Sequence, residues 1–317
     1  AGNESYRRKL VQYYQKVGID VNYDQIMITT GGSEAILFGF FTCLNPGDEV
    51  IVPEPFYANY NGFACAAGVN VIPITSHIET GFALPPIDEF EKVITPKTKA
   101  IIICSPNNPT GYLYSKEEMY KLKDLCLKHD LYLFSDEAYR EFCYDGDYVS
   151  ALHIEGLEQH VVLMDTISKR YSACGARLGA LVTKNKAVYD AAMKFAQARL
   201  SPPGLAQIMG EAAIDLPESY FEAPKAEYLS RRNLLVKRLN AMPGVRFASP
   251  DILLTRTAVP APNDAGYSPN QASYMNTGAY ASLRMQDVWE QTQGSASVVI
   301  AVLDSGILFD NTELKGR

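Results

Sequence analysis

VVLMDTISKRYSACGARLG, the stretch from Val161 to Gly179, joins an uninterrupted apolar run to a polar turn that contains glycine. Val161–Asp165 has the length and composition of a strand buried on both faces, and Leu178–Thr183 forms a second apolar run directly after the turn. Strands of this kind belong to sheets that helices cover on both sides. The stretch therefore predicts an α/β fold with Lys169 in a turn at the end of one strand.

The same alternation of apolar strands and helical stretches extends from the N-terminus to about residue 215. It predicts a mostly parallel, seven-stranded sheet between helices. The predicted strands are Gln25–Thr29, Glu49–Val52, Val69–Ile74, Ala100–Cys104, Leu131–Ser135, Val161–Asp165 and Leu178–Thr183. The predicted helices are Tyr6–Val17, Glu34–Leu44, Ala58–Ala67, Lys116–His129, Lys186–Ala198 and Leu205–Leu216.

The pattern changes beyond residue 215. Glu218–Met242 is typical of one long amphipathic helix, whose basic residues are most simply its solvated face. These basic residues are Arg231, Arg232, Lys237 and Arg238. Residues 255–282 are rich in Pro, Asn, Ser and Thr, as in a linker, and Val298–Leu303 is an apolar strand. We therefore expect a large domain over 1–215, a long helix and the start of a small domain over 216–246, a linker over 247–282 and a short α/β tail over 283–317.

The composition narrows the class of protein. Hydrophobic residues make up 47% and charged residues 21% of 317 residues, which is typical of a soluble globular protein. A net charge of −7 argues against binding to nucleic acid or to a membrane surface, and no apolar run is long enough to span a membrane. Six irregularly spaced cysteines predict buried free thiols in a reducing cytoplasm.

Polar turns follow five of the predicted strands, and ligands bind open α/β sheets where the carboxyl ends of strands meet. We therefore expect these turns to form one site. They are Thr30–Ala35 (TGGSEA), Pro53–Tyr57 (PEPFY), Ser105–Gly111 (SPNNPTG), Ser135–Tyr139 (SDEAY) and Thr166–Arg170 (TISKR), the last followed by Gly175–Gly179 (GARLG).

The first three turns each allow a structural and a chemical interpretation. The glycines of TGGSEA bring backbone N–H groups to an anion at a helix start, although a plain strand-to-helix turn looks the same. Tyr57 can stack on a flat ring or pack in the core. The paired asparagines of SPNNPTG form a rigid polar turn, in which an Asn–Pro bond is a candidate for the cis form.

The last two turns carry the reactive groups. Asp136 ends a very apolar strand, where a buried carboxylate needs a cationic partner such as a protonated pyridine nitrogen. Tyr139 follows on the same side of the turn. Lys169 taken alone is more simply a surface lysine, but after a buried strand it suits Schiff-base chemistry. Arg177 offers a planar fork for a phosphate.

Together, the motifs TTGGSEA, NPGDEVIVPEPFY, SPNNPTG, SDEAY and SKRYSACGARLG resemble the class I/II aminotransferases. These are fold-type I enzymes of the aspartate-aminotransferase superfamily, and they depend on pyridoxal 5′-phosphate (PLP). The resemblance covers about residues 1–245. It implies the PLP-dependent transferase fold for the large domain and the transfer of an amino group from an amino acid to a 2-oxo acid. It also implies a homodimer.

The resemblance assigns a role to each candidate residue. Lys169 would form a Schiff base with PLP and move a proton, Asp136 would pair with the pyridine nitrogen, and these two with Tyr139 would be the catalytic residues. Tyr139 and Asn108 would bind the phenolic oxygen of PLP, and Tyr57 would stack on its ring. Four residues would hold the phosphate: Gly32, Ser33, Thr166 and Arg177. Thr166 departs from the serine that is usual in the family.

The chain also departs from the family at both ends. Family members have a segment before the position of Ala1 that carries part of the substrate gate. They also have a C-terminal small domain whose arginine binds the substrate carboxylate. The chain leaves the family pattern at about Val245, and Arg256 and Arg284 lie in unrelated sequence. We therefore expect catalysis to be impaired, and metal ligands play no part in the expected site.

From about Phe247 the chain is similar to a different family, the N-terminal part of a subtilisin-like serine protease. DVWEQTQGS and VVIAVLDSGI carry this likeness, and Asp304 would be the catalytic aspartate of that family. The family's order is Asp, His, Ser, whereas every histidine of this chain lies before Asp304. A triad therefore cannot form within the chain, and Asp304 is better explained as an aspartate at a strand end.

The sequence leaves several functions open. The first is a PLP-dependent aminotransferase. The second is an inactive chimera that at most binds PLP. A third is another fold-type I PLP enzyme, such as a lyase or a decarboxylase, because the cofactor residues are shared. A protease fragment is disfavoured by the absence of the histidine and serine of the triad.

Overall fold

A computed structural model describes residues 1–144 and 146–245. Within this part of the chain, residues 1–230 belong to one compact unit and residues 231–245 to a second. The predictions for 247–317, including the linker, the protease-like tail and Asp304, lie outside the described residues. The fold of the first unit can therefore be compared with the sequence, whereas the fold of the tail stays a prediction.

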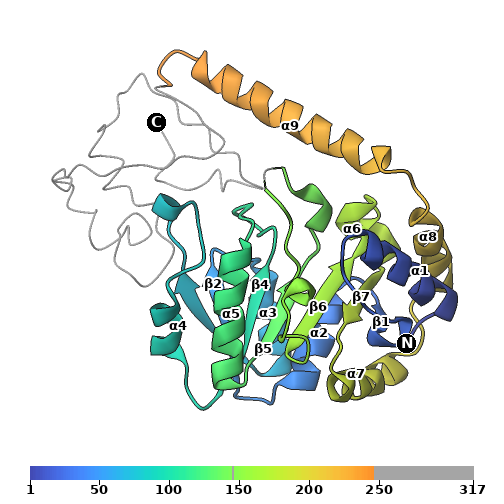
Figure 1. Ribbon diagram of the computed structural model, residues 1–317. Helices are drawn as coiled ribbons and strands as arrows, with labels where there is room; N and C mark the ends of the chain where they lie inside the picture. The colour runs from blue at the N-terminus through green and yellow to red at the C-terminus, as the bar shows by residue number, and fades with distance from the viewer. Residues whose placement is uncertain (145, 246–317) are drawn as a thin grey trace, which may run out of the picture. The chain divides into compact units, whose positions relative to one another are not determined.

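A seven-stranded sheet forms the centre of the first unit (Figure 1). Its strand order is β1-β7-β6-β5-β4-β2-β3. The strands are β1 Ile26–Thr29, β2 Glu49–Glu54, β3 Asn70–Thr75, β4 Thr98–Cys104, β5 Tyr132–Asp136, β6 Val161–Thr166 and β7 Gly179–Val182. Only β7 runs against its neighbours, since it pairs antiparallel with both β1 and β6. The predicted mostly parallel sheet of seven strands is confirmed.

Every helix predicted from the apolar pattern is present. The helices are α1 Glu4–Lys16, α2 Gly32–Cys43, α3 Asn59–Ala67, α4 Ile87–Val93, α5 Lys116–His129, α6 Ile167–Arg170, α7 Lys186–Arg199, α8 Gly204–Ala213 and α9 Ser219–Asn240. The sequence did not indicate α4 or α6. Seven and four residues are too few to show a helical period, and α4 buries one large apolar side chain, Phe90.

Both faces of the sheet are apolar, and helices cover each of them. Ile101 and Ile103 of β4 pack into one apolar cluster with residues of α1, α5 and α8, whereas Ile102 packs into a second cluster with residues of α2, α3 and α7. Successive side chains of a strand point to opposite faces, so a strand between two layers of helices needs apolar residues at every position. This explains the uninterrupted apolar runs in the sequence.

Helix α9 extends from the first unit into the second. Its predicted length is confirmed, but none of its residues is buried. The expectation of an amphipathic helix with a buried face is therefore wrong for most of α9. At its start Tyr220 and Phe221 are partly buried against Tyr171, and farther along the Tyr228 ring lies edge to face with Phe142, with ring centres 6.1 Å apart. The four basic residues that follow are exposed, as predicted.

All six cysteines lie in the described part of the chain, and all are free thiols. Cys104 and Cys126 are buried, as predicted, whereas Cys43 and Cys143 are half-buried and Cys65 and Cys174 are exposed, so the prediction is wrong for these four. No helix among residues 1–144 and 146–245 is both long and apolar enough to cross a membrane. The same residues contain no group of three or more His, Cys, Asp and Glu side chains arranged to hold a metal ion.

Candidate active site

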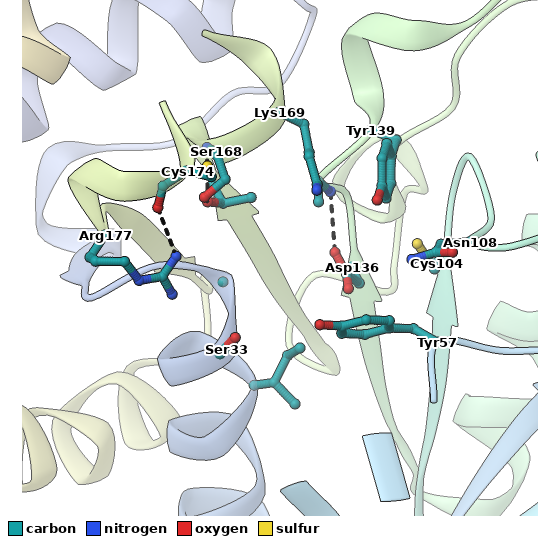
Figure 2. Close-up of a pocket in the computed structure, with 14 residues that line it drawn as sticks. Ser33, Tyr57, Cys104, Asn108, Asp136, Tyr139, Ser168, Lys169, Cys174 and Arg177 are labelled. Atoms are coloured by element: carbon teal, nitrogen blue, oxygen red, sulfur yellow. Dashed lines mark hydrogen bonds between the residues drawn. The ribbon is translucent and has the colours of Figure 1, made fainter. Parts of the chain in front are cut away.

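The carboxyl ends of β4, β5 and β6 meet at one edge of the sheet. Cys104 of β4 lies opposite Asp136 of β5, and β5 in turn pairs in parallel with β6, which ends at Thr166. A cavity of about 230 Å³ opens at this edge. All nine predicted site residues line it (Figure 2): Gly32, Ser33, Tyr57, Asn108, Asp136, Tyr139, Thr166, Lys169 and Arg177. The structure therefore brings together turns that are up to 145 residues apart in the chain.

Asp136 is the buried acid of the site, with 8% of its surface exposed. Both of its hydrogen-bond donors are neutral. The Tyr60 hydroxyl donates to Oδ2 at 2.9 Å, and the Ala138 backbone N–H donates to Oδ1 at 3.2 Å, which is the bond drawn to Asp136 in Figure 2. Burial raises the pKa of Asp136 to about 6, although both hydrogen bonds act to lower it. The carboxylate therefore lacks the cation that would offset its burial.

Lys169 lies on the short helix α6, directly after β6. Thr166 caps this helix by accepting a hydrogen bond from the Ser168 backbone N–H. The residues that flank the lysine turn inward, and the guanidinium of Arg170 forms an ion pair with Asp165. Lys169 itself is exposed and lines the cavity, with its Nζ atom 5.7 Å from the centre of the Tyr139 ring. The ion pair therefore fixes the turn while leaving the amine free to point into the site.

Gly31, Ser33 and Arg177 form a cradle for an anion at one end of the cavity. Gly31 has a φ of +87°, and a Cβ atom at this position would lie 2.5 Å from Nη2 of Arg177. Only glycine both adopts this backbone conformation and leaves room for the guanidinium. Arg177 donates hydrogen bonds to the backbone oxygens of Thr30 and Cys174, so its planar group is held in place. No side chain caps the start of α2 next to it, where backbone N–H groups favour an anion.

The hydroxyl of Thr166 already has protein partners. It donates to the backbone oxygen of Leu178 at 3.1 Å and accepts from the Ser168 hydroxyl at 2.8 Å. Ser168 also lines the cavity, although the sequence did not single it out. Its position between Thr166 and Lys169 is the sequence feature that could have identified Ser168 as a site residue. Thr166 therefore supports the turn, and Ser168 adds a second hydroxyl beside the predicted phosphate residues.

The two asparagines of SPNNPTG have different roles. Asn107 holds the loop, because its side-chain amide donates to the Pro55 backbone oxygen at 3.0 Å and to Thr110 Oγ1 at 2.8 Å. Asn108 instead lines the cavity. The Asn108–Pro109 bond is cis, as the sequence allowed. Tyr57 also lines the cavity, and its ring lies edge to face with the Tyr60 ring, with ring centres 5.5 Å apart and ring planes at 87°.

A buried ionic network lies behind the site. Arg140 forms ion pairs with Glu137 at 2.8 Å and with Asp165 at 3.5 Å. Glu137 directly follows Asp136 in the chain, and Asp165 directly precedes Thr166. Burial acts to raise the pKa of Asp165, but attraction to Arg170 and Arg140 outweighs it and lowers that pKa. One guanidinium thus connects the strand end that carries Asp136 with the strand end that leads to Lys169.

Tyr60, Cys104, Ala138 and Cys174 belong to the site or its immediate support but were not predicted. Cys104 ends a strand in the same way as Asp136, and this position could have identified it as a site residue. Tyr60 lies inside the predicted helix Ala58–Ala67, where an aromatic residue is most simply explained as part of the hydrophobic core.

The arrangement fits a flat cofactor with a phosphate at one end and a basic ring nitrogen at the other. The cradle that Gly31 opens suits the phosphate, and the buried carboxylate of Asp136 suits a protonated nitrogen. Lys169 supplies a primary amine at the same cavity, and Tyr57 supplies a ring to stack on. These are the properties of PLP.

The chain is similar to known aminotransferases. The chain is 36% identical to an aromatic-amino-acid aminotransferase of Thermococcus litoralis over 71% of its length, and 33% identical to an aspartate aminotransferase of Pyrococcus horikoshii over 79%. It spans 59% and 64% of those proteins. A double mutant of Thermus thermophilus aspartate aminotransferase has a similar structure, with a TM-score of 0.71, 32% identity and coverage of 76% of this chain and 63% of its own.

The match to a family covers more of the chain than these single relatives suggest. Residues 1–263 match the family described as aminotransferase class I and II, past the point near residue 245 where the sequence motifs end. Members of this family depend on PLP. The chain therefore belongs to the class I and II aminotransferases.

Proposed function

We propose that the chain is a PLP-dependent aminotransferase that moves an amino group between an amino acid and a 2-oxo acid. The observation that carries this proposal is the meeting of Lys169, Asp136 and Arg177 at one cavity. The three residues offer an amine, a buried carboxylate and an anion-binding fork. Each is suited to a different part of the cofactor.

Each residue acts on a different atom or group. Bound PLP supplies an electron sink that stabilises negative charge at the substrate Cα. Lys169 would hold the cofactor through its amine, and its Nζ would then take a proton from the substrate Cα and return one. Asp136 keeps the proton on the ring nitrogen. Tyr139 and Asn108 bind the phenolic oxygen, and Tyr57 stacks on the ring.

The phosphate contacts hold the cofactor during the reaction. Arg177 supplies a charged, planar donor, while Ser33 and the N–H groups of Gly32 and its neighbours supply neutral ones. Thr166 contributes mainly by fixing Ser168, because its own hydroxyl is hydrogen-bonded to protein atoms. The binding energy is therefore concentrated at an end of the cofactor that does not react.

The assembly that we propose is a homodimer in a reducing, cytoplasmic environment. Helix α8 exposes a row of large apolar side chains: Leu205 at 84%, Ile208 at 60% and Met209 at 43%. Contiguous exposed apolar surface is typical of an interface. Six free thiols fit a reducing compartment.

The first experiment tests cofactor binding. The purified chain with PLP should show a visible absorbance band that is absent from Lys169→Ala and retained by Lys194→Ala, which removes an exposed lysine of α7. Sodium borohydride should then fix the cofactor to the wild-type chain at one lysine. A wild-type chain that gives no band would refute the proposal.

A second experiment separates turnover from binding. An amino acid should convert the bound cofactor to its amine form, and a 2-oxo acid should restore the original band. A chain that binds PLP without this conversion would be the inactive alternative. Release of carbon dioxide or cleavage of the substrate side chain would instead indicate another PLP-dependent reaction.

A further inference from the structure

Tyr60 is a buried polar residue that none of the proposed steps uses. It lies on α3, three residues after Tyr57, and is only 1% exposed. Its hydroxyl donates to Asp136 Oδ2 at 2.9 Å, although 76 residues separate the two in the chain. A tyrosine in an apolar core usually has to find a partner for its hydroxyl, and here that partner is the one buried carboxylate that lines the cavity.

The Asp136 carboxylate is held from two sides by different elements. The Tyr60 hydroxyl binds Oδ2, while the Ala138 backbone N–H binds Oδ1 at 3.2 Å. One donor on each oxygen fixes the plane of the carboxylate relative to the cavity. Because Tyr57 and Tyr60 contact each other edge to face, the stacking ring and the hydrogen-bond donor are also fixed relative to one another.

We propose that Tyr60 is a positioning residue, which keeps Asp136 ionised and aimed at the ring nitrogen of PLP. The inference rests on the proposed function, because it concerns the same cavity. Tyr60 does not touch the reacting atoms. It acts through Asp136, so its removal should weaken only those interactions that depend on the ring nitrogen.

The surroundings of Asp136 show why such a donor is needed. Burial raises the pKa of Asp136 most, and the nearby charges of Glu137 and Asp165 raise it further. The hydrogen bonds of Tyr60 and Ala138 act in the opposite direction. Cys104 on β4 also faces this region, and burial raises the pKa of its thiol well above the usual value, so it adds no charge near neutral pH. The other ionisable side chains that line the cavity are Tyr57, Tyr139, Lys169, Cys174 and Arg177.

The test compares two cofactors. Tyr60→Phe removes one hydroxyl and keeps the ring, and PLP is compared with an analogue whose pyridine nitrogen is replaced by a carbon. Since a hydrogen bond to a charged group is involved, we expect Tyr60→Phe to weaken PLP roughly tenfold and the carbon analogue less than about twofold. The readout is the dissociation constant, measured by absorbance titration.

Tyr112→Phe is the matched control. It also breaks a hydrogen bond between a tyrosine and a carboxylate, because the Tyr112 hydroxyl donates to Glu118 at 2.9 Å, but Tyr112 does not line the cavity. It should weaken neither cofactor. In turnover, Tyr60→Phe should lower kcat while leaving KM for the amino acid within about twofold, as for an interaction that matters mainly in the transition state.

Equal losses for the two cofactors, or no loss for either, would overturn the role of Tyr60. If Tyr60→Phe does not fold, Tyr60→Met takes its place, since methionine fills irregular space and donates no hydrogen bond. The two proposals fail differently. If the wild-type chain binds no PLP, both proposals are refuted. If the wild-type chain and Tyr60→Phe bind PLP equally well, only the role of Tyr60 is refuted.

Discussion

Replacing Asp136 by asparagine should stabilise the cofactor-free protein, and the gain should depend on pH. The side chain keeps its shape: its amide oxygen can accept from the Ala138 backbone N–H, and its amide NH2 can donate to the Tyr60 hydroxyl oxygen. What disappears is a buried negative charge whose two hydrogen-bond donors are neutral. A charge of this kind destabilises a folded protein unless a cation offsets it. Cofactor binding and stability should therefore respond in opposite directions to this one change.

The size of the effect follows from the pKa of Asp136, which is about 6 in the folded protein against 3.8 for an unperturbed carboxyl. Between these values the folded protein holds a proton that the unfolded protein has lost. The contribution of Asp136 to stability is therefore highest below pH 3.8 and falls as the pH rises through 6, by about 3 kcal/mol in total. Asparagine does not titrate, so Asp136→Asn should match the wild type at pH 4 and exceed it by about 3 kcal/mol at pH 8.

The assay is urea unfolding of the cofactor-free proteins across pH 4–8, followed by far-UV circular dichroism. Asp124→Asn, on an exposed position of α5, reports the effect of losing one surface charge. The decisive quantity is the difference between Asp136→Asn and the wild type at each pH. A difference that does not change between pH 4 and pH 8, or a variant less stable than the wild type at pH 8, would refute the reasoning.

Three further changes test other parts of the structure. Gly31→Ala forces a side chain onto a φ of +87° and against Arg177, so it should lower stability by more than about 1 kcal/mol and weaken PLP several-fold, as thermal melts and titration would show. Arg140→Met leaves Glu137 without its buried cation and should cost about 3–5 kcal/mol in urea unfolding; a loss below about 1 kcal/mol would contradict this. Ile208→Glu should convert a dimer to a monomer in analytical ultracentrifugation, whereas an unchanged sedimentation coefficient would exclude α8 from the interface.

The sheet and most of the site were predictable because both depend on local patterns. Each central strand is an uninterrupted apolar run, and each reactive group directly follows such a run. Asp136 follows LYLFS, and Lys169 lies four residues after Asp165. Since parallel strands end at the same edge, residues in these positions must meet. The assignment of Lys169 and Asp136 to one cavity required no knowledge of side-chain conformations.

The rest depends on contacts between segments that are far apart in the chain. The pairing of Tyr60 with Asp136 requires the packing of α3 on the sheet, and a tyrosine inside a helix has no local feature that shows it. The ion pairs of Arg140 with both Glu137 and Asp165 likewise connect two turns that are separate in the sequence. Asn107 holds the loop and Asn108 lines the cavity. Because the two residues are adjacent, the sequence does not indicate which of the two amides faces the cavity.

The antiparallel pairing of β1 with β7 has a consequence for how the chain folds during synthesis. Ile26 pairs with Val182, so β1 has no neighbour in the sheet until 156 more residues have been made. At 5–20 residues per second this wait lasts on the order of 10–30 s. During that time the GG turn after β1 has no Arg177 beside it. The cradle of Gly31, Ser33 and Arg177 is therefore complete only after β7 has joined the sheet, and we expect PLP to bind only after that point.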